Sequence, residues 1–521
     1  MKQTFVVIML TILVCGCTKH FDEINKNPYD FNEEELKPDF KLLGEPLVQV
    51  MLNYVVVEDP YRAQVTQNLL GDVYAGYMMC PQPFEDNRNN TTYVLLDKWT
   101  NLLWERTYGY IMANCNYVME RAGREYADFY AWAQILRVIG MHRISDIYGP
   151  VIYTKYKQIN SDHSIDYDSQ QEAYYAFFKD LDGAIRVLEG YANTTQQHFK
   201  KFDLAYDGDY RKWIKLANTL RLRLAIRISG VDPVKAKTEG EAALRHPLGI
   251  LSATDENFSI NTAPLSHPLN VIGHTWDDTR MGAPMESILT GYNDPRLPKY
   301  FEYSKLEDRV YHGIRNGISI TSKETYEGFS QLAVLPNRIQ FLTTAEAWFL
   351  KAEAALYGWN GAGDVRSNYE AGIRASFEQY GLLPYFNSYI ADHTAIPKPY
   401  RDPLNSVNNV STGDENLSTI TIRWENDDTP ARKLERIITQ KWIAMFPEGQ
   451  EAWSEFRRTG YPRLFPVVVN NSGNLISTKD FIRRVNFARS EYTTNPLGVA
   501  RAVRMLKGPD NGGTRLWWDQ R

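Results

Sequence analysis

The chain has 521 residues, of which 43% are hydrophobic and 23% are charged, and its formal net charge is −5. This balance is typical of a globular protein, long enough for one large domain or for two to three ordinary ones. No block of basic residues stands out, so nucleic acid is not expected as a partner. Aromatic residues make up 13%, with 33 tyrosines and 12 tryptophans, which can fill a core and can also stack on ligand rings.

The N-terminus has the features of an exported, lipid-anchored protein. A positively charged start leads into an apolar run at residues 5–14, which is too short to span a bilayer. Cys17 directly follows a small residue, which resembles the lipobox of bacterial lipoproteins, where this cysteine is lipidated. We expect a signal peptide at residues 1–16, lipid on Cys17 as the attachment to the membrane, and a polar tether at residues 17–39. The alternative is an ordinary secretory signal with an incidental cysteine.

Helical periodicity dominates the next part of the chain. Two helices broken near Pro60 are expected within residues 40–74, followed by a long polar loop over residues 72–92. That loop carries Tyr74 and Tyr77, which we expect to be exposed. Further helices are predicted at residues 95–121, 126–144, 169–188 and 209–228, with another beginning at Pro233.

Two cysteines, Cys80 and Cys115, remain after the signal peptide. Export would permit a disulfide bond between them, but their spacing does not establish one. Two separate buried thiols are an equally good interpretation.

The character of the sequence changes after His246. Residues 250–338 show few helical periods and many Pro, Gly, Asn and aromatic residues, which predicts an irregular insertion with short strands. Helices return at residues 339–357 and 364–380, and small residues on the first would let the second approach closely, as in a tetratricopeptide unit. The stretch 435–462 predicts a second helical hairpin, whose large inner aromatics we interpret as core packing.

Motifs that carry chemistry are missing from the sequence. We find no glycine-rich phosphate loop, metalloprotease, calcium-loop or serine-hydrolase motif, and the nine histidines are scattered. No catalytic residue, cofactor or metal site is therefore expected. Asp277 and Asp278, in an aromatic-rich loop, raise the alternative of a glycosidase acid and base, but adjacent side chains usually point apart. We favour a solvated or turn-forming pair, or a cation site, over that alternative, and enzyme activity is disfavoured.

Five separated stretches point to one family. The sequence QKWIAMFPEGQEAWSEFRRTGYP at residues 440–462 resembles the signature of the SusD/RagB family of outer-membrane nutrient-binding lipoproteins. Weaker similarities to the same family are AEAWFLKAEAALYG at 345–358, FDEINKNP at 21–28, DIYGPVIY at 146–153 and TRLWWD at 514–519. One departure is Phe487-Ala488, where the family often has Tyr-Pro.

The resemblance implies a mostly α-helical fold over residues 40–521, with tetratricopeptide-like helix pairs as a scaffold and a loop-rich part that carries the ligand site. It also implies a place on the outer surface of a Bacteroidetes-type outer membrane. The protein would cap a SusC-like TonB-dependent transporter and pass it a captured oligosaccharide or, in some members, a peptide. The alternatives are a lipid-anchored glycan hydrolase and a tetratricopeptide-type assembly scaffold without a small ligand.

No family motif fixes the ligand-binding residues, so we infer them from composition. Sugars need flat aromatic faces, with amide, carboxylate or cationic groups nearby for the hydroxyls. The two loop regions with that composition contain the candidates Tyr74, Tyr77, Trp276, Asp277, Asp278, Arg280, Tyr311, Tyr326 and Phe329.

Overall fold

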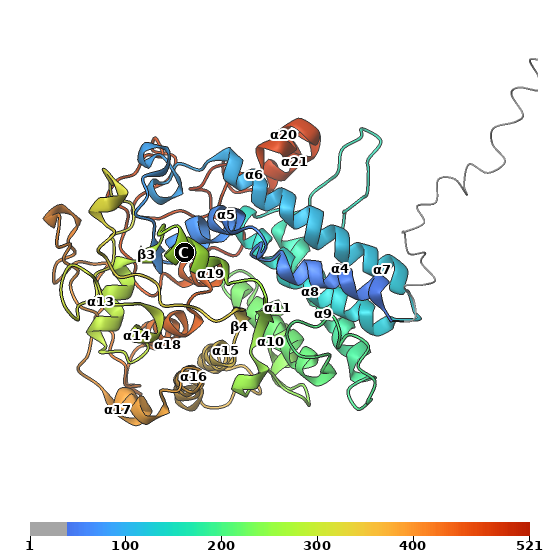
Figure 1. Cartoon of the computed structure of the whole chain (residues 1–521). Helices are drawn as coiled ribbons and strands as arrows, with labels where there is room; N and C mark the ends of the chain where they lie inside the picture. Colours follow the sequence, from blue (N-terminus) through green and yellow to red (C-terminus); the bar gives the residue numbers. More distant parts are fainter. Residues whose placement is uncertain (1–38) are drawn as a thin grey trace, which may run out of the picture.

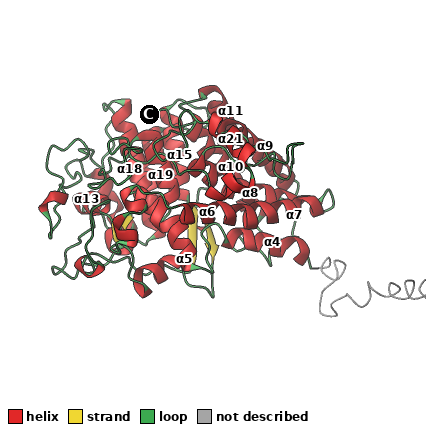
Figure 2. Cartoon of the chain, turned by 90° about the horizontal axis from the view of Figure 1, so that it is seen from above, coloured by secondary structure: helices red, strands yellow, loops and turns green. Residues whose placement is uncertain are grey.

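The computed structural model describes residues 39–521, so Cys17 and most of the expected tether lie outside the described residues. The described chain is mostly helical, as predicted, with very short strands (Figures 1 and 2). The α-helices before the loop-rich part are α4 (Lys41–Leu52), α5 (Pro60–Ala63), α6 (Asp97–Arg106), α7 (Ala113–Ala122), α8 (Ala127–Tyr148), α9 (Gln170–Glu189), α10 (Tyr210–Ile228) and α11 (Pro233–Leu244). Those that follow are α12 (Pro268–Asn270), α13 (Ala283–Gly291), α14 (Leu297–Tyr300), α15 (Thr344–Leu356), α16 (Val365–Gln379), α17 (Phe386–Ala391), α18 (Pro430–Met445), α19 (Gly449–Thr459), α20 (Arg489–Thr494) and α21 (Pro496–Met505).

Helix pairs form the scaffold. The pairs α8–α9, α10–α11 and α15–α16 pack side by side, and α10 also contacts α9 and α15, so the pairs run on from one another (Figure 1). In the pair α15–α16 the close approach is made by Gly372, where a Cβ atom would come within 2.8 Å of the Phe349 ring. The tetratricopeptide-like arrangement expected from the sequence is confirmed.

Three scaffold helices, α9, α10 and α11, begin at residues that cap them. Ser169 caps α9 with a reciprocal pair of hydrogen bonds to Glu172, and the Asp209 carboxylate caps α10. Asp232 caps α11, whose first residue is Pro233. These starts agree with the sequence prediction to within one residue.

Two π-helical segments extend the first helices. The segment η1 (Gln64–Asp72) continues α5, and η4 (Thr107–Met112) joins α6 to α7. η1 packs against α19, where a Cβ atom on Gly449 would lie 2.4 Å from the Cα of Asp72. Gly449 therefore allows direct backbone contact between two segments far apart in sequence.

Residues 250–338 contain short strands, as predicted. The secondary structure in and just after this segment differs from the prediction in two places. β2 (Phe258–Asn261) pairs with β4 (Arg338–Leu342), and β1 (Met78–Met79) pairs with β3 (Arg280–Met281), both antiparallel. The start of the helix expected at 339–357 is therefore wrong, because its first residues pair with β2. A helix, α13, forms within the segment expected to be irregular, and α13 and β3 lie among the loops at the left of Figure 1.

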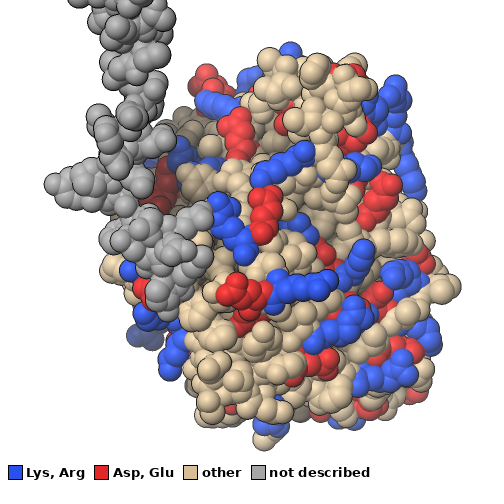
Figure 3. All heavy atoms as spheres, turned by 90° about the vertical axis from the view of Figure 1, so that its right-hand side faces the viewer, with Lys and Arg blue, Asp and Glu red and all other residues tan. Residues whose placement is uncertain are grey.

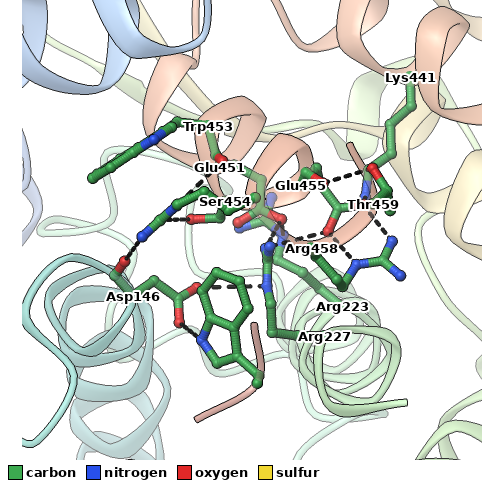
Figure 4. A network of polar contacts seen from close by, with 12 residues as sticks. Asp146, Arg223, Arg227, Lys441, Glu451, Trp453, Ser454, Glu455, Arg458 and Thr459 are labelled. Atoms are coloured by element: carbon green, nitrogen blue, oxygen red, sulfur yellow. Dashed lines mark hydrogen bonds and ion pairs between the residues drawn. The ribbon is translucent and has the colours of Figure 1, made fainter. Parts of the chain in front are cut away.

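A network of buried charges joins the scaffold helices (Figure 4). From α10, Arg223 pairs with Glu346 of α15 at 2.6 Å, and Arg227 pairs with Glu455 of α19 at 3.1 Å and with Glu451. Burial pushes the pKa of Glu455 upward, but the surrounding cations outweigh it and hold that pKa well below its ordinary value. Charges buried this deeply are tolerated only because they are paired.

The two cysteines are free and buried, so they do not form a disulfide bond. Burial raises the pKa of the Cys115 thiol to about 12, which makes it unreactive at neutral pH.

The outer face of the helical end is an ordinary solvated surface. Basic and acidic side chains alternate over it without a large area of one sign (Figure 3). Arg186 and Asp182 of α9, 2.6 Å apart, form one of the exposed pairs of the helical scaffold. Pairs of this kind contribute little to stability.

Candidate loop site

The candidate site is built where three backbone segments meet, and we call it the loop site: residues 276–280, 311–314 and 323–331, together with Tyr303, whose ring packs on Tyr311. The Met281 N–H donates to the carbonyl oxygen of Ser330 at 2.9 Å, and the Ser330 N–H donates to that of His312 at 2.9 Å. The Ile314 N–H donates back to the carbonyl of Met281 at 2.8 Å. These bonds bring Tyr311 and Phe329 next to the loop that carries Trp276.

The turn before β3 presents that loop. The segment η6 (Val271–Thr275) ends in two backbone hydrogen bonds, from Trp276 N–H to the carbonyl of Val271 at 2.9 Å and from Asp278 N–H to that of Ile272 at 2.8 Å. Asp277 takes a left-handed conformation with φ of 59°, which aspartate tolerates better than most residues. Trp276 is half-buried, with part of its ring against the core.

Arg280 is a brace and not an exposed ligand-binding group. It is only 1% exposed, which corrects its choice as a ligand-binding candidate. Its guanidinium donates to the Asp277 carboxylate at 2.7 Å and to the Glu327 carbonyl at 3.0 Å. It therefore fixes the distance between the first and third segments.

The two aspartates are held by different partners. Besides Arg280, Asp277 accepts a hydrogen bond from the Gln331 amide at 2.9 Å. Asp278 accepts from the Lys323 ammonium at 2.9 Å and from the Gln64 amide at 3.2 Å, and Lys323 also donates to the Trp276 carbonyl at 2.5 Å. The pair therefore works as a turn with bonded carboxylates, the interpretation favoured from the sequence.

The aromatic residues of the loop site fall into two layers. Tyr311 is half-buried and lies 4.7 Å, between ring centroids, from Tyr303, which is 52% exposed. Tyr326 and Phe329 are buried in a small hydrophobic cluster with Met79 and three isoleucines. Burial raises the pKa of Tyr326 to about 12. The first pair faces solvent, whereas Tyr326 and Phe329 are buried and present no ring face to a ligand, which corrects their choice as binding candidates.

Tyr74 and Tyr77 are placed elsewhere, and their expected exposure is wrong. Tyr77 is fully buried, donates to the carbonyl of Trp442 and packs 4.9 Å from its ring. Tyr74 lies at the end of the first helical segment, donates to the carbonyl of Asn90 at 3.1 Å and packs on Trp453. The helix extends further than the loop prediction allowed, so both rings turn toward the hairpin α18–α19.

Three members of the loop site were missed from the sequence: Lys323, Gln331 and Tyr303. Lys323 is 45 positions from Asp278, and Gln331 is 54 positions from Asp277, so no local spacing relates them. Tyr303 had a usable signal, since it stands in the same aromatic-rich insertion as Tyr311.

Neither metal binding nor membrane spanning finds support in the described part of the chain. Among residues 39–521, no group of three or more His, Cys, Asp or Glu side chains is arranged to hold a metal ion. Within the same residues, no helix combines the length and the apolar character needed to cross a membrane.

Comparisons with known proteins agree with one another. The family model described as SusD-like, "Susd and RagB outer membrane lipoprotein", matches residues 23–519. A chitin-binding SusD homologue from Flavobacterium johnsoniae is 43% identical, with a TM-score of 0.88, covering 92% of this chain and 98% of its own. SusD homologues from Bacteroides uniformis (36% identity, TM-score 0.85) and Bacteroides thetaiotaomicron (34%, 0.85) each cover 92% of this chain and 99% of their own. No curated protein matches this sequence.

Proposed function

Because this chain belongs to the SusD-like family of outer-membrane lipoproteins, we propose that it binds an oligosaccharide at the loop site and delivers it to a TonB-dependent transporter. The family and the outer-membrane location expected from the sequence are confirmed. Lipidation of Cys17, the transporter partner and the binding residues remain our proposals.

The observation that carries the proposal is the convergence of the three loop segments. They place a half-buried tryptophan, a solvent-facing pair of tyrosines and bonded carboxylate and ammonium groups in one region. Flat rings suit the C–H face of a pyranose, and the polar groups suit its hydroxyls. Trp276, Tyr303 and Tyr311 would contact the sugar, and Asp277 and Asp278 would accept hydrogen bonds from it.

Other candidates have a different role in this proposal. Arg280 positions the loops, and Tyr326 and Phe329 fill the small buried cluster of the loop site. Tyr74 and Tyr77 are left out, because neither has a ring face open to a ligand.

For the ligand we propose an oligosaccharide of chitin type. The support is the 43% identity with a chitin-binding homologue over 92% of this chain. The N-acetyl groups of chitin add amide donors and acceptors, which the loop-site carboxylates and the Lys323 ammonium can bond.

Calorimetric titration of Trp276→Ala with chitotetraose tests the binding proposal. We expect affinity to fall about tenfold or more, as for other aromatic anchors. Trp348→Ala is the matched control, because Trp348 is also half-buried but lies on the scaffold helix α15. Unchanged affinity in Trp276→Ala would remove the loop site from consideration.

Incubation of the wild-type protein with chitotetraose separates binding from catalysis. A binding protein retains chitotetraose without product, whereas shorter sugars in the supernatant would favour the hydrolase alternative. An absence of saturable binding to any saccharide or peptide would favour the pure scaffold.

Delivery and anchoring need a cellular test. We expect the full-length protein to co-purify with a TonB-dependent transporter from outer membranes, and Cys17→Ser to leave it unanchored or unprocessed. Membrane attachment that survives Cys17→Ser would contradict the lipid anchor.

A further inference from the structure

A depression separate from the loop site lies where α8 ends, α9 begins and the C-terminal segment returns to them. Its volume is about 300 Å³, and it is lined by Ser169, Gln171, Leu506, Lys507, Leu516 and Trp517 among others. We call it the Trp517 pocket. It shares no residue with the loop site.

The floor of the Trp517 pocket is apolar and closely packed. Leu516 is buried, and Gly149, with φ of 93°, ends α8 beneath it. A Cβ atom on Gly149 would lie 3.2 Å from the Leu516 side chain and 3.4 Å from that of Leu506. The backbone therefore comes directly against the floor, and a larger residue at this position would disturb it.

The tryptophan at its edge is held in place by the protein. The backbone N–H of Trp517 donates to the side-chain oxygen of Gln170 at 2.9 Å. The side-chain amide N–H of Gln170 in turn donates to the Ser145 carbonyl at 2.8 Å. The Trp517 ring lies 6.1 Å from the Tyr174 ring in an edge-on arrangement. A ligand would meet a preorganised aromatic face, which lowers the entropic cost of binding.

The neighbouring residues Trp517 and Trp518 differ in burial and in the hydrogen bonding of their indole N–H groups. Trp518 is buried, and its indole N–H donates to Asp146 at 2.8 Å. Trp517 is half-buried, and within residues 39–521 its indole N–H has no hydrogen-bond partner. One ring completes the core, and the other keeps a donor available beside an open volume.

The rim supplies further polar groups. Lys507 is exposed and has no ion-pair partner among residues 39–521, and Gln171 is exposed beside Ser169, with its amide N–H donating to the Tyr175 hydroxyl at 3.1 Å. Arg515 is instead engaged by Asp519 at 3.2 Å and Asp480 at 3.3 Å. The pocket thus combines one flat ring, one indole donor, an amide and an ammonium around an apolar floor.

We propose that the Trp517 pocket is a second saccharide-binding site, which stacks one pyranose ring on Trp517 and bonds its hydroxyls through the indole N–H, Gln171 and Lys507. The volume lies at the lower end of the range for small-ligand pockets, which suits one sugar unit. The inference rests on the proposed function only for the class of ligand. Two sites on one anchored chain would retain a long glycan more tightly than either alone, because the second contact is intramolecular.

Fluorine NMR of the folded chain labelled with 5-fluorotryptophan tests this proposal directly. Trp517→Phe and Trp276→Phe assign the two resonances, and chitobiose and maltose are the probes. We expect the Trp517 resonance to shift saturably with at least one of them and to do so equally in Trp276→Ala. A Trp517 resonance that neither sugar moves overturns the proposal.

The two proposals fail separately in this experiment. A sugar that shifts the Trp276 resonance but not the Trp517 resonance supports the loop site and overturns the second site. A sugar that shifts only the Trp517 resonance supports the second site and contradicts the loop site. The exposed variants Gln171→Ala and Lys507→Ala, which leave the packed ring in place, should each weaken the Trp517 response about threefold or more without changing that of Trp276. A Trp517 resonance insensitive to sugars but moved by the purified transporter would make the pocket a protein contact, and the saccharide proposal would be wrong.

Discussion

The scaffold and the loop site use the same charged residue types in two different ways. In the scaffold, Arg227 and its acidic partners on α8 and α19 are almost entirely buried and join helices that are far apart in sequence (Figure 4). In the loop site, Lys323 and Asp278 keep 20% and 13% of their side chains exposed, and they join loops. Because the first set is buried, breaking its pairs strongly lowers the free energy of unfolding. Because the second set is partly exposed, its pairs can rearrange with a smaller loss of free energy.

This difference indicates how stability and binding are separated in the molecule. Buried, paired charges fix the relative position of the helices, so that the scaffold can hold loops whose own contacts are weaker. The loops can then be adapted to a ligand without unfolding the chain. Substitutions in each region can test that separation.

Arg227→Ala should have the largest effect on stability. It leaves Glu451 and Glu455 buried without their shared cation, and breaking buried pairs of this kind costs about 3–5 kcal/mol of the free energy of unfolding. Urea denaturation followed by circular dichroism measures the loss. The control is Arg366→Ala, which removes an exposed pair with Glu370 on α16 and should cost less than about 0.5 kcal/mol. Equal losses would contradict the special role of the buried network.

Gly449→Ala should disturb the contact between α19 and η1. A Cβ atom there would lie 2.4 Å from the Asp72 Cα, so one backbone must move. Overpacking of this kind costs about 1–3 kcal/mol. Thermal unfolding measures it, and Gly230→Ala, with nothing within 4 Å of the added atom, is the matched control. A stable Gly449→Ala protein would show that this contact is looser than the structure indicates.

Asp72 should give the scaffold a pH dependence of defined sign. Burial, aided by nearby Glu448, raises the Asp72 pKa to about 8, although the Gln67 amide opposes the shift. Between about pH 4 and pH 8 the folded protein keeps a proton that the unfolded chain has lost, so stability falls as pH rises through this window. One such group lowers the free energy of unfolding by up to about 1.4 kcal/mol per pH unit within this window.

Asp72→Asn tests this sign, because the amide cannot ionise. The melting temperature of the variant should fall less between pH 5 and pH 8 than that of the wild-type protein. Asp427→Asn, at an exposed position, is the control and should keep the wild-type slope. A wild-type slope in Asp72→Asn would assign the pH dependence to another group.

The sequence predicted the scaffold far better than the loop site, for a physical reason. Helix periodicity and caps such as Asp209 are local signals, so both ends of α9 and α10 and the start of α11 were placed to within one residue. The strand β4 was missed, because its partner β2 lies almost 80 residues earlier and pairing leaves no local trace. The loop site depends on pairs of the same kind, such as Lys323 with Asp278, and its members were chosen by composition alone. Composition does not distinguish an exposed ring from a buried one, which is why Tyr77 was expected at the surface.

Lys323→Met should have the smallest effect on stability and a clear effect on binding. The change removes the hydrogen bonds to Asp278 and to the Trp276 carbonyl while keeping most of the side-chain volume, so the turn that presents Trp276 loses its brace. Because the pair is partly exposed, we expect the free energy of unfolding to change by less than about 1 kcal/mol. We expect affinity for chitotetraose to fall about tenfold, which is about 1.4 kcal/mol in binding free energy. Lys299→Met, at an exposed position on α14, is the control and should change neither quantity. If Lys323→Met lost as much stability as Arg227→Ala, the loops would be part of the cooperative scaffold, and the separation between the two regions would be wrong.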